Sequence, residues 1–350
     1  MKNAWKKLLI LGLVACLILA GCGPQNPEPL PSDEPSLEPS AEPSDPVETF
    51  EGMDINLAVL SGPTGVGAAK LLSDSDADQS VNHYHYTICT DNEQVVAGLT
   101  SGEFDIAAIA TNVAANLYNK SNGTIQIAAI NTLGVLYILG PSDKPIEYLG
   151  ELRGKTLYAT GQGANPQYAL DYLLTENGLD PSKDVNIVWG TPDEVNVAML
   201  QGKADYCMLP VPAATALEAK SEGKVKSYIS LSDEWDYLRN GSQLTMGCVV
   251  VRADFAEENP QAVEAFLSEY EQSIAYVQDN PDQAAALVAG YGIAPSEAIA
   301  AKAIPQCNLT FIAGSEMRAT IQGYYEILFA ADPASIGGGN PDDGFYFIAG

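Results

Sequence analysis

Residues 90–110 read TDNEQVVAGLTSGEFDIAAIA, and about 100 positions later residues 191–209 read TPDEVNVAMLQGKADYCML. Each stretch opens with helix-capping residues and a Glu in the first turn, continues with apolar residues at helical spacing, and then reaches Gly and Asp before a short apolar run. The pattern predicts two helices that end at Gly102 and Gly202, followed by buried strands at residues 106–110 and 206–209. Two copies in the same order indicate two related βαβ lobes.

The flanking sequence extends the same repeat. An apolar run at 55–60 and another at 156–159 are each followed by a Gly-rich loop and a helical pattern, which is typical of an α/β protein. Short strands are predicted at 134–139 and 245–251, where each lobe ends. We take these strands as two hinge crossovers with a ligand cleft between the lobes. Lobe one would then comprise residues 50–138 plus 248–350, and lobe two residues 139–247. Further helices are predicted at residues 260–278, 281–288, 295–303 and 315–330.

Composition excludes several classes of protein. Of 350 residues, 46% are apolar and 18% are charged, which suffices for folded cores and excludes global disorder. The chain has 17 Lys and Arg and 45 Asp and Glu, which gives a formal net charge of −28. A chain of this sign does not bind nucleic acid or an anionic lipid surface through its overall charge. We expect a monomer that binds no nucleic acid.

The N-terminal segment reads as an export signal. Residues 1–21 join a basic head to an apolar run too short to span a bilayer, and Leu-Ala-Gly precedes Cys22. This pattern predicts a lipoprotein signal peptide, with Cys22 lipidated (palmitate among its acyl chains) and the mature chain anchored to the extracytoplasmic face of the cell membrane. A plain secretory signal with an incidental Cys is the alternative. Residues 22–49 repeat Glu-Pro-Ser and predict an extended, polyproline-like tether.

Ligands of open parallel sheets bind beyond the carboxyl ends of the strands. The loops expected there are rich in hydroxyls, amides and glycine and hold no Lys, Arg or His, which suits a neutral polar ligand or an anion held through backbone N–H groups alone. Each loop taken alone could also be a tight turn with capping residues. The candidate ligand-binding residues are Ser61, Gly62, Thr64, Gly65, Thr111, Asn112, Asn131, Thr160, Gly161, Gln162, Gly163 and Pro210.

Motifs for catalysis and metal binding are incomplete. The segment 62–70 lacks the Gly-Lys-Ser/Thr ending of a phosphate-binding loop, and Pro166 stands where a dinucleotide fingerprint needs its third glycine. His83 and His85 alternate with tyrosines on a predicted strand. They could hold a metal, but a solvated strand face is the stronger interpretation. We therefore expect no enzyme activity, no metal and no cofactor.

Four cysteines lie beyond the signal region, at positions 89, 207, 248 and 307. An exported chain with an even number of cysteines permits disulfides, with Cys248 and Cys307 as the favoured pair. All four sit in apolar surroundings, where buried free thiols are equally natural. Both interpretations remain open at this stage.

The lipobox, the Pro-rich tether, LSGPTG at 60–65, LRGKT at 152–156 and ATG at 159–161 together resemble a substrate-binding lipoprotein of an ABC importer. The similar subgroup handles nitrate, taurine, aliphatic sulfonates and thiamine-pyrimidine precursors. The resemblance implies a two-lobed, type II periplasmic-binding-protein-like receptor that closes on a small ligand and delivers it to an ABC permease and its ATPase.

The loops of this chain lack the Arg expected of anion-binding members, which shifts the expected ligand to a neutral or heteroaromatic compound. Tyr137, Trp189, Trp235 and Tyr237 could stack on such a ring, although packing is the more common role of such residues. A ligand-sensing lipoprotein and a pyrimidine-precursor enzyme on the same fold are the alternative functions.

Overall fold

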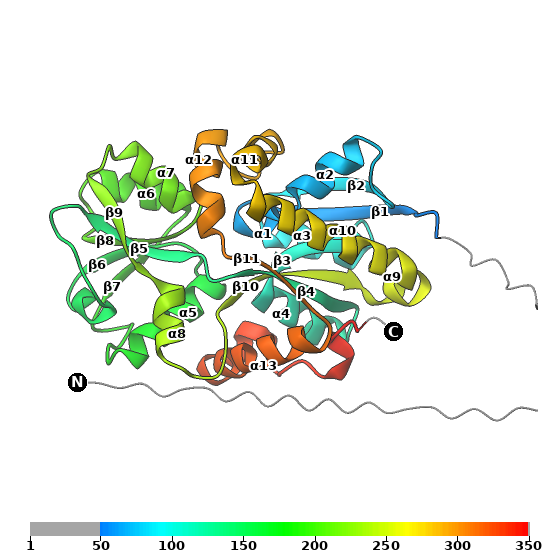
Figure 1. Ribbon diagram of the computed structural model, residues 1–350. Coiled ribbons are helices and arrows are strands. Elements are labelled where there is room, and N and C mark those ends of the chain that lie inside the picture. Colours follow the sequence, from blue (N-terminus) through cyan, green and yellow to red (C-terminus); the bar gives the residue numbers. More distant parts are fainter. Residues whose placement is uncertain (1–49, 349–350) are drawn as a thin grey trace, which may run out of the picture. The chain divides into compact units, whose positions relative to one another are not determined.

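Two mixed β-sheets organise the chain, and a computed structural model describes residues 50–348 (Figure 1). The predicted signal peptide, lipidated Cys22 and tether fall at residues 1–49, outside the described residues. Each sheet has helices packed on its faces, so the predicted two-lobed α/β architecture is confirmed. We call the six-stranded sheet with its helices lobe one and the five-stranded sheet with its helices lobe two.

The sheet of lobe one has the strand order β11-β4-β10-β3-β1-β2. Strand β1 runs parallel to β2 and β3, whereas β10 is antiparallel to its neighbours β3 and β4. The strands are β1 (Asp54–Leu60), β2 (His83–Cys89), β3 (Ile106–Ala110), β4 (Ile125–Leu133), β10 (Thr245–Arg252) and β11 (Leu309–Ala313).

The sheet of lobe two has the order β7-β6-β8-β5-β9. Strand β6 is parallel to β7 and β8, and β5 is antiparallel to β8 and β9. With β11 set aside, the two sheets have the same order and the same sense of pairing, as the sequence repeat predicts. The strands are β5 (Leu136–Pro141), β6 (Thr156–Ala159), β7 (Asn186–Trp189), β8 (Tyr206–Pro210) and β9 (Val225–Ser230).

The repeat extends to individual hydrogen bonds. The Asp105 carboxylate accepts a hydrogen bond from the backbone N–H of Asn56 at 2.9 Å, and the Asp205 carboxylate accepts one from Thr156 N–H at 2.8 Å. In both lobes the aspartate therefore ties the start of its own strand to the start of the neighbouring parallel strand. The spacing between glycine and aspartate, which is the same in the two stretches, thus serves sheet assembly.

The chain changes sheet just before β5 and again between α8 (Leu231–Tyr237) and β10. The first change occupies residues 134–135, so β5 begins two residues later than the predicted strand. Gly134 lies against α8, where an added Cβ would come within 2.2 Å of Ser232 Oγ. The second change occupies residues 238–244. Val135 O accepts a hydrogen bond from Val211 N–H at 3.1 Å, which fixes the first crossover to the loop after β8.

The predicted helices are present. Helix α3 (Asn92–Ser101) is capped by Asp91 rather than Thr90, and α6 (Pro192–Leu200) starts with a full capping box between Thr191 and Glu194. Gly102 ends α3 with φ of 80°, a backbone conformation that favours glycine. Within residues 50–348, no helix combines the length and the apolar character needed to cross a membrane. The remaining α-helices are α1 (Pro63–Val66), α2 (Ala69–Asp76), α4 (Thr111–Ser121), α5 (Asn165–Glu176), α7 (Ala213–Lys220), α9 (Ala253–Glu258), α10 (Pro260–Asp279), α11 (Pro281–Gly290), α12 (Glu297–Ala303) and α13 (Gly314–Ala331).

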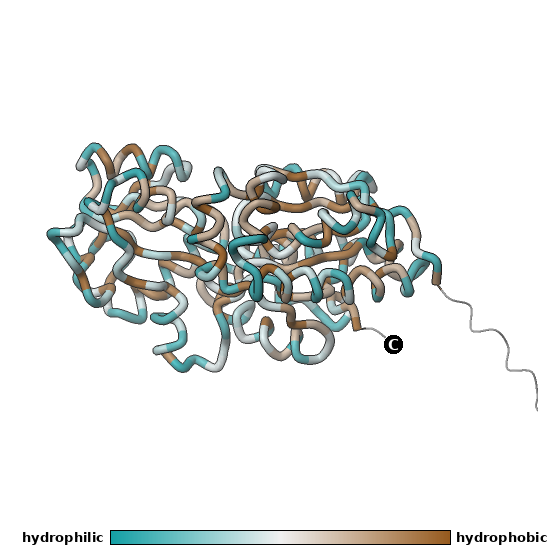
Figure 2. The backbone as a smooth tube through the Cα atoms, turned by 45° about the horizontal axis from the view of Figure 1, so that its top comes forward, coloured by the Kyte–Doolittle hydropathy of each residue, from teal (hydrophilic) through white to brown (hydrophobic). Residues whose placement is uncertain are grey.

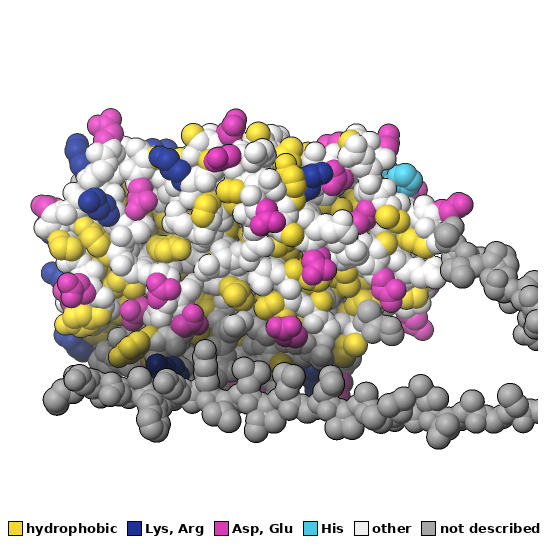
Figure 3. Space-filling model, in the orientation of Figure 1, with side chains coloured by type: hydrophobic (Ala, Val, Ile, Leu, Met, Phe, Trp, Pro, Cys, Tyr) yellow, Lys and Arg dark blue, Asp and Glu magenta, His cyan; other side chains and the backbone are white. Residues whose placement is uncertain are grey.

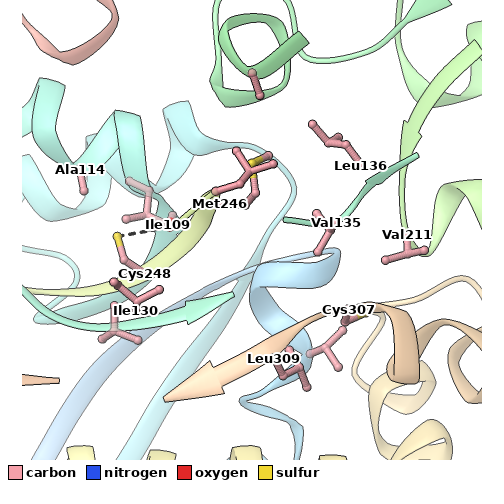
Figure 4. Packing of buried hydrophobic residues seen from close by; sticks show 14 of the residues in the cluster. Ile109, Ala114, Ile130, Val135, Leu136, Val211, Met246, Cys248, Cys307 and Leu309 are labelled. Carbon is pink, nitrogen blue, oxygen red and sulfur yellow. Dashed lines mark hydrogen bonds between the residues drawn. The ribbon is translucent and has the colours of Figure 1, made fainter. Parts of the chain in front are cut away.

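Apolar residues fill the interior of both lobes, and brown, hydrophobic stretches run through both halves of the tube in Figure 2. Cys89, Cys207, Cys248 and Cys307 are all buried free thiols, so the favoured Cys248–Cys307 disulfide is not formed. Figure 4 shows Cys248 on β10 and Cys307 in the segment before β11, and Cys248 donates to Ile109 O at 3.6 Å. Burial raises the pKa of Cys307 to about 12, which makes this thiol unreactive in the folded protein.

Candidate functional site

A cleft of about 660 Å³ lies between the two lobes. Lobe one contributes residues 61–63 after β1, Thr90 after β2, and part of the segment 289–295, which runs from the end of α11 towards α12. Lobe two contributes the loop 210–212 after β8 and one face each of α6 and α7. Helix α12 also packs against α7, which brings the C-terminal part of the chain to the boundary between the lobes (Figure 1).

The lobe-one loop of the cleft is held by backbone hydrogen bonds. Ser61 N–H donates to Cys89 O at 2.8 Å, and Gly62 N–H donates to Ile293 O at 3.1 Å. Gly62 has φ of 90°, which a residue with a side chain adopts only with strain. The loop therefore holds the backbone of Ser61 at a fixed position next to the start of α1.

The lobe-two wall carries the charged side chains of the cleft. Asp193 and Asn196 lie one turn apart on α6, and Lys220 is the last residue of α7. Asp193 and Lys220 are exposed and form no ion pair or side-chain hydrogen bond with any residue in 50–348. Asn196 is only 5% exposed, and its Oδ1 has no hydrogen-bond partner among the described residues.

The cleft contains three of the predicted site residues: Ser61, Gly62 and Pro210. The absence of Lys, Arg and His from the strand-end loops holds, but Lys220 brings a positive charge to the cleft from a helix. The prediction from the loops missed Asp193, Asn196 and Lys220. Their spacing along α6 and α7 places them on one face of each helix, and this spacing is the sequence signal that could have located them.

A second contact between the lobes lies at the start of α5, and we call it the Asn165 seam. The Asn165 side chain, 1% exposed, donates from Nδ2 to Thr111 Oγ1 at 2.8 Å and to Met246 O at 3.1 Å. Its Oδ1 accepts a hydrogen bond from the Tyr324 hydroxyl at 2.9 Å. Asn165 belongs to lobe two and all three partners belong to lobe one, so these bonds join the lobes directly.

The predicted residues Thr111 and Asn112 lie at or beside this seam. Thr111 Oγ1 donates to Thr245 O at 2.7 Å while accepting from Asn165. Asn112 is 3% exposed and donates weakly to Ser335 O at 3.4 Å, and its Oδ1 has no partner among residues 50–348. These side chains are therefore enclosed by protein in this structure.

Asn131, Thr64 and Gly65 are also interior. Asn131 Nδ2 donates to Thr64 O at 3.0 Å and to the Tyr270 hydroxyl at 2.9 Å. Gly65 packs so closely on β1 that an added Cβ would lie 2.2 Å from Leu60 O. In this structure these three residues support the loop 61–63 from behind and do not line the cleft.

The predicted loop 160–163 follows β6 and leads to Asn165. Thr160 is buried, whereas Gln162 is exposed. Gly161 has φ of 89°, and Gly163 N–H donates to Gln167 Oε1 at 2.8 Å, so the loop folds over the start of α5. None of residues 160–163 lines the cleft in this structure.

The aromatic residues considered for ring stacking lie outside the cleft lining. Trp235 is fully buried, with its ring centroid 4.9 Å from that of Tyr172 and 5.6 Å from that of Tyr324. Tyr237 is 84% exposed, and Tyr137 and Trp189 are half-buried. Trp235 has a packing role next to the Asn165 seam.

His83 and His85 lie exposed on one face of β2, as predicted for a solvated strand face. Within residues 50–348, no cluster of three or more His, Cys, Asp or Glu is arranged to hold a metal ion. Nine of the 14 Lys and Arg in these residues fall between positions 136 and 244. On the face shown in Figure 3, the Lys and Arg side chains accordingly gather over lobe two, while Asp and Glu spread over both lobes.

Comparison with known proteins identifies the fold. The model of a protein family described as "NMT1/THI5 like" matches residues 86–284, which is more than half of the chain. A Bacillus subtilis (strain 168) protein named "Putative binding protein YtlA" is 24% identical over 139 residues. That alignment covers 38% of this chain and 41% of the relative, so the chain matches less than half of the relative's length.

Solved structures match a much larger share of the chain. An ABC transporter structure from Parabacteroides distasonis has a TM-score of 0.70 at 23% identity, covering 83% of this chain and 98% of that one. The periplasmic aliphatic sulphonate binding protein SsuA from Escherichia coli has a TM-score of 0.68 at 16% identity, covering 85% of this chain and 92% of that one. These similarities assign residues 50–348 to the periplasmic-binding-protein fold.

Proposed function

Because the chain belongs to the NMT1/THI5 like family, we propose that it is an extracytoplasmic solute-binding lipoprotein of an ABC importer. In this role it captures a small polar molecule between its lobes, performs no chemistry on it, and delivers it to a membrane permease driven by an ATPase. The protein acts as a monomer and is held to the membrane by a lipid on Cys22.

The observation that carries the proposal is the cleft between the lobes. The cleft lies at the carboxyl ends of β1, β2 and β8, where open α/β sheets bind ligands. Its volume of about 660 Å³ suits a small molecule, and its walls combine hydroxyls, an amide and two opposite charges with apolar surface. Two crossovers between the sheets allow the lobes to close around the ligand.

The remaining predicted ligand residues, Thr111, Asn112 and the loop 160–163, also belong to the proposal. They lie at or next to the Asn165 seam and become accessible to a ligand only when the lobes separate there. Domain movement of this kind is common in two-lobed proteins that enclose their ligands. The ligand would then contact both the cleft and the polar groups of the seam.

Ligand binding is tested by a thermal-shift screen of the full chain with pyrimidines, vitamins, amino acids and sulfonates, followed by calorimetry on any hit. We expect one chemical class to raise the melting temperature and to be recovered unchanged after incubation. Recovery of a converted product would support an enzyme on this fold instead. Absence of stabilisation by every class would contradict the binding-protein proposal.

The membrane anchor needs a separate test. Cells that express the chain would be grown with labelled palmitate, and the Cys22→Ser variant would serve as the control. Label on the parent chain and none on the variant supports the anchor. Equal membrane association of both chains would contradict it. Uptake of the identified ligand by cells with and without the protein then separates a transport role from a sensing role.

A further inference from the structure

The two charged groups of the cleft differ in sign, and neither forms an ion pair with another residue in 50–348. Asp193 belongs to the first turn of α6, and Lys220 ends α7. Lobe one faces them with the hydroxyls of Ser61 and Thr90 and with a Gly-, Ala- and Pro-rich segment at 289–295. Every charged side chain of the cleft lining therefore comes from lobe two.

Asn196 adds a group whose hydrogen bonding is incomplete. Asn196 belongs to the cleft lining and is 5% exposed, and its Oδ1 is enclosed in this structure and accepts no hydrogen bond from residues 50–348. Leaving a buried acceptor without a donor destabilises the empty protein. Rotation about χ2 turns the amide so that either its oxygen or its nitrogen faces the cleft. A ligand with an N–H donor would supply the missing partner.

We propose that the cleft binds a small zwitterion of the amino carboxylate class. Its amino group would be held on the α6 face by Asp193 and Asn196, and its carboxylate by Lys220 on the α7 face. This inference rests on the proposed function and specifies its ligand. A ligand with one charge would leave the opposite charge of the closed cleft without a partner, whereas a zwitterion compensates both.

The two charges also have an alternative role at the helix ends. A carboxylate near the start of α6 and an ammonium at the end of α7 both have favourable signs for the helix dipoles. A role confined to the helices affects stability and leaves ligand affinity unchanged. Binding measurements therefore distinguish the two roles.

The experiment uses the full chain and three matched sets of probes. The first set contains ω-amino carboxylates from two to six carbons, the second the same carboxylates without the amino group, and the third the same amines without the carboxylate. We expect at least one amino carboxylate to bind in calorimetry. Both of its truncated analogues should bind at least ten-fold more weakly.

Variants then assign the contacts. Asp193→Asn, Asn196→Leu and Lys220→Met should each weaken binding of that amino carboxylate at least ten-fold, and Lys220→Arg should retain most of the affinity because it keeps the charge. Matched controls are Asp143→Asn and Lys203→Met, which change exposed lobe-two residues outside the cleft. The controls should bind like the parent. The melting temperature of each empty variant verifies that it is folded.

The outcomes separate this inference from the proposed function. Equal binding by the parent and by both Asp193→Asn and Lys220→Met overturns the inference, as does stabilisation of the parent only by a compound without an amino or a carboxylate group. In either case the proposed binding function stands. If no small molecule of any class stabilises the parent, the proposed function fails together with the inference.

Discussion

Asn165 and Asn196 are both buried asparagines on lobe-two helices, yet only the side chain of Asn165 has its hydrogen-bonding groups satisfied. Asn165 is 1% exposed and has three hydrogen bonds, all to lobe one. Asn196 is 5% exposed, lines the cleft, and has an acceptor with no partner among the described residues. The first side chain lies where the lobes touch, and the second lies where they leave a space.

The difference separates two roles for polar groups at a boundary between lobes. Satisfied groups at the Asn165 seam stabilise contact between the lobes without a ligand, at about 1 kcal/mol net for each hydrogen bond. An unsatisfied acceptor at the cleft destabilises the ligand-free protein slightly. It also increases the affinity for a ligand that supplies a hydrogen-bond donor. The two asparagines should therefore respond in opposite directions to the same substitution.

The largest effect is expected from Asn165→Leu. Leucine has a similar size but leaves the Tyr324 hydroxyl without its acceptor, so we expect a loss of about 2–4 kcal/mol in the free energy of unfolding. Urea unfolding measures this loss. The control is Asn177→Leu at the other end of α5, where the amide makes one local bond to Leu173 O. A loss below about 1 kcal/mol for Asn165→Leu would show that the seam contributes little.

Tyr324→Phe removes one member of the same network and should have a smaller effect. The variant keeps the ring that packs on Trp235 but leaves Asn165 Oδ1 without a donor. We expect a loss of about 1–2 kcal/mol by the same urea measurement. Because the two residues share a bond, the double variant should lose less than the sum of the single losses. Strict additivity would contradict a direct coupling.

Asn196→Leu should change the empty protein in the other direction. Removing an unpartnered acceptor raises the free energy of unfolding by up to about 1 kcal/mol or leaves it unchanged. A loss larger than about 1 kcal/mol would mean that Asn196 has a structural partner and that the contrast with Asn165 is wrong.

Site-resolved thiol labelling tests which part of the fold opens more readily in each variant. Cys248 lies in β10, two residues after Met246, whose carbonyl accepts from Asn165. All four thiols of the described residues should label slowly in the native parent and fully in urea, since they are buried and free. Asn165→Leu should accelerate labelling of Cys248, and Asn196→Leu should not. Equal acceleration in both variants would remove the distinction.

The last test concerns the pH dependence of stability. Burial raises the pKa of the Cys207 and Cys307 thiols from 9.0 to about 12 in the folded protein. The unfolded chain therefore loses these protons first, so their contribution to stability is complete below about pH 9 and is lost as the pH rises from about 9 to 12. Urea midpoints measured from pH 7 to pH 10.5 should be flat and then fall. A midpoint that rises above pH 9 would contradict this expectation.

Local sequence signals predicted the elements of the fold and their order. Capping residues at 90–93 and 191–194, together with the repeated Gly–Asp spacing, located both βαβ units, because such patterns depend on neighbouring residues. The start of β5 shifted by two residues because Gly134 lies in the passage between sheets, which periodicity cannot detect. Whether Cys248 and Cys307 form a disulfide likewise depends on the distance between them in the fold, which their separation along the sequence does not encode.

The candidate site was only partly predictable. Ser61, Gly62 and Pro210 follow strand ends, so the rule for open sheets located them at the cleft. Asn196 and Lys220 lie on helix faces whose orientation depends on packing against the sheet. Asn131 was expected at the ligand, but its amide contacts Tyr270, which lies 139 positions away in the sequence. Long-range partners of this kind decide whether a polar loop residue faces a ligand or the interior.

The two passages of the chain between the sheets also constrain the mechanics of the molecule. A single connection would let one lobe swivel in several directions, whereas two connections, at 134–135 and 238–244, leave mainly rotation about the line that joins them. The Asn165 seam and the cleft are then governed by one angular coordinate. Any substitution that shifts the preferred angle changes both the strength of the seam and the affinity for ligand, even when it touches neither.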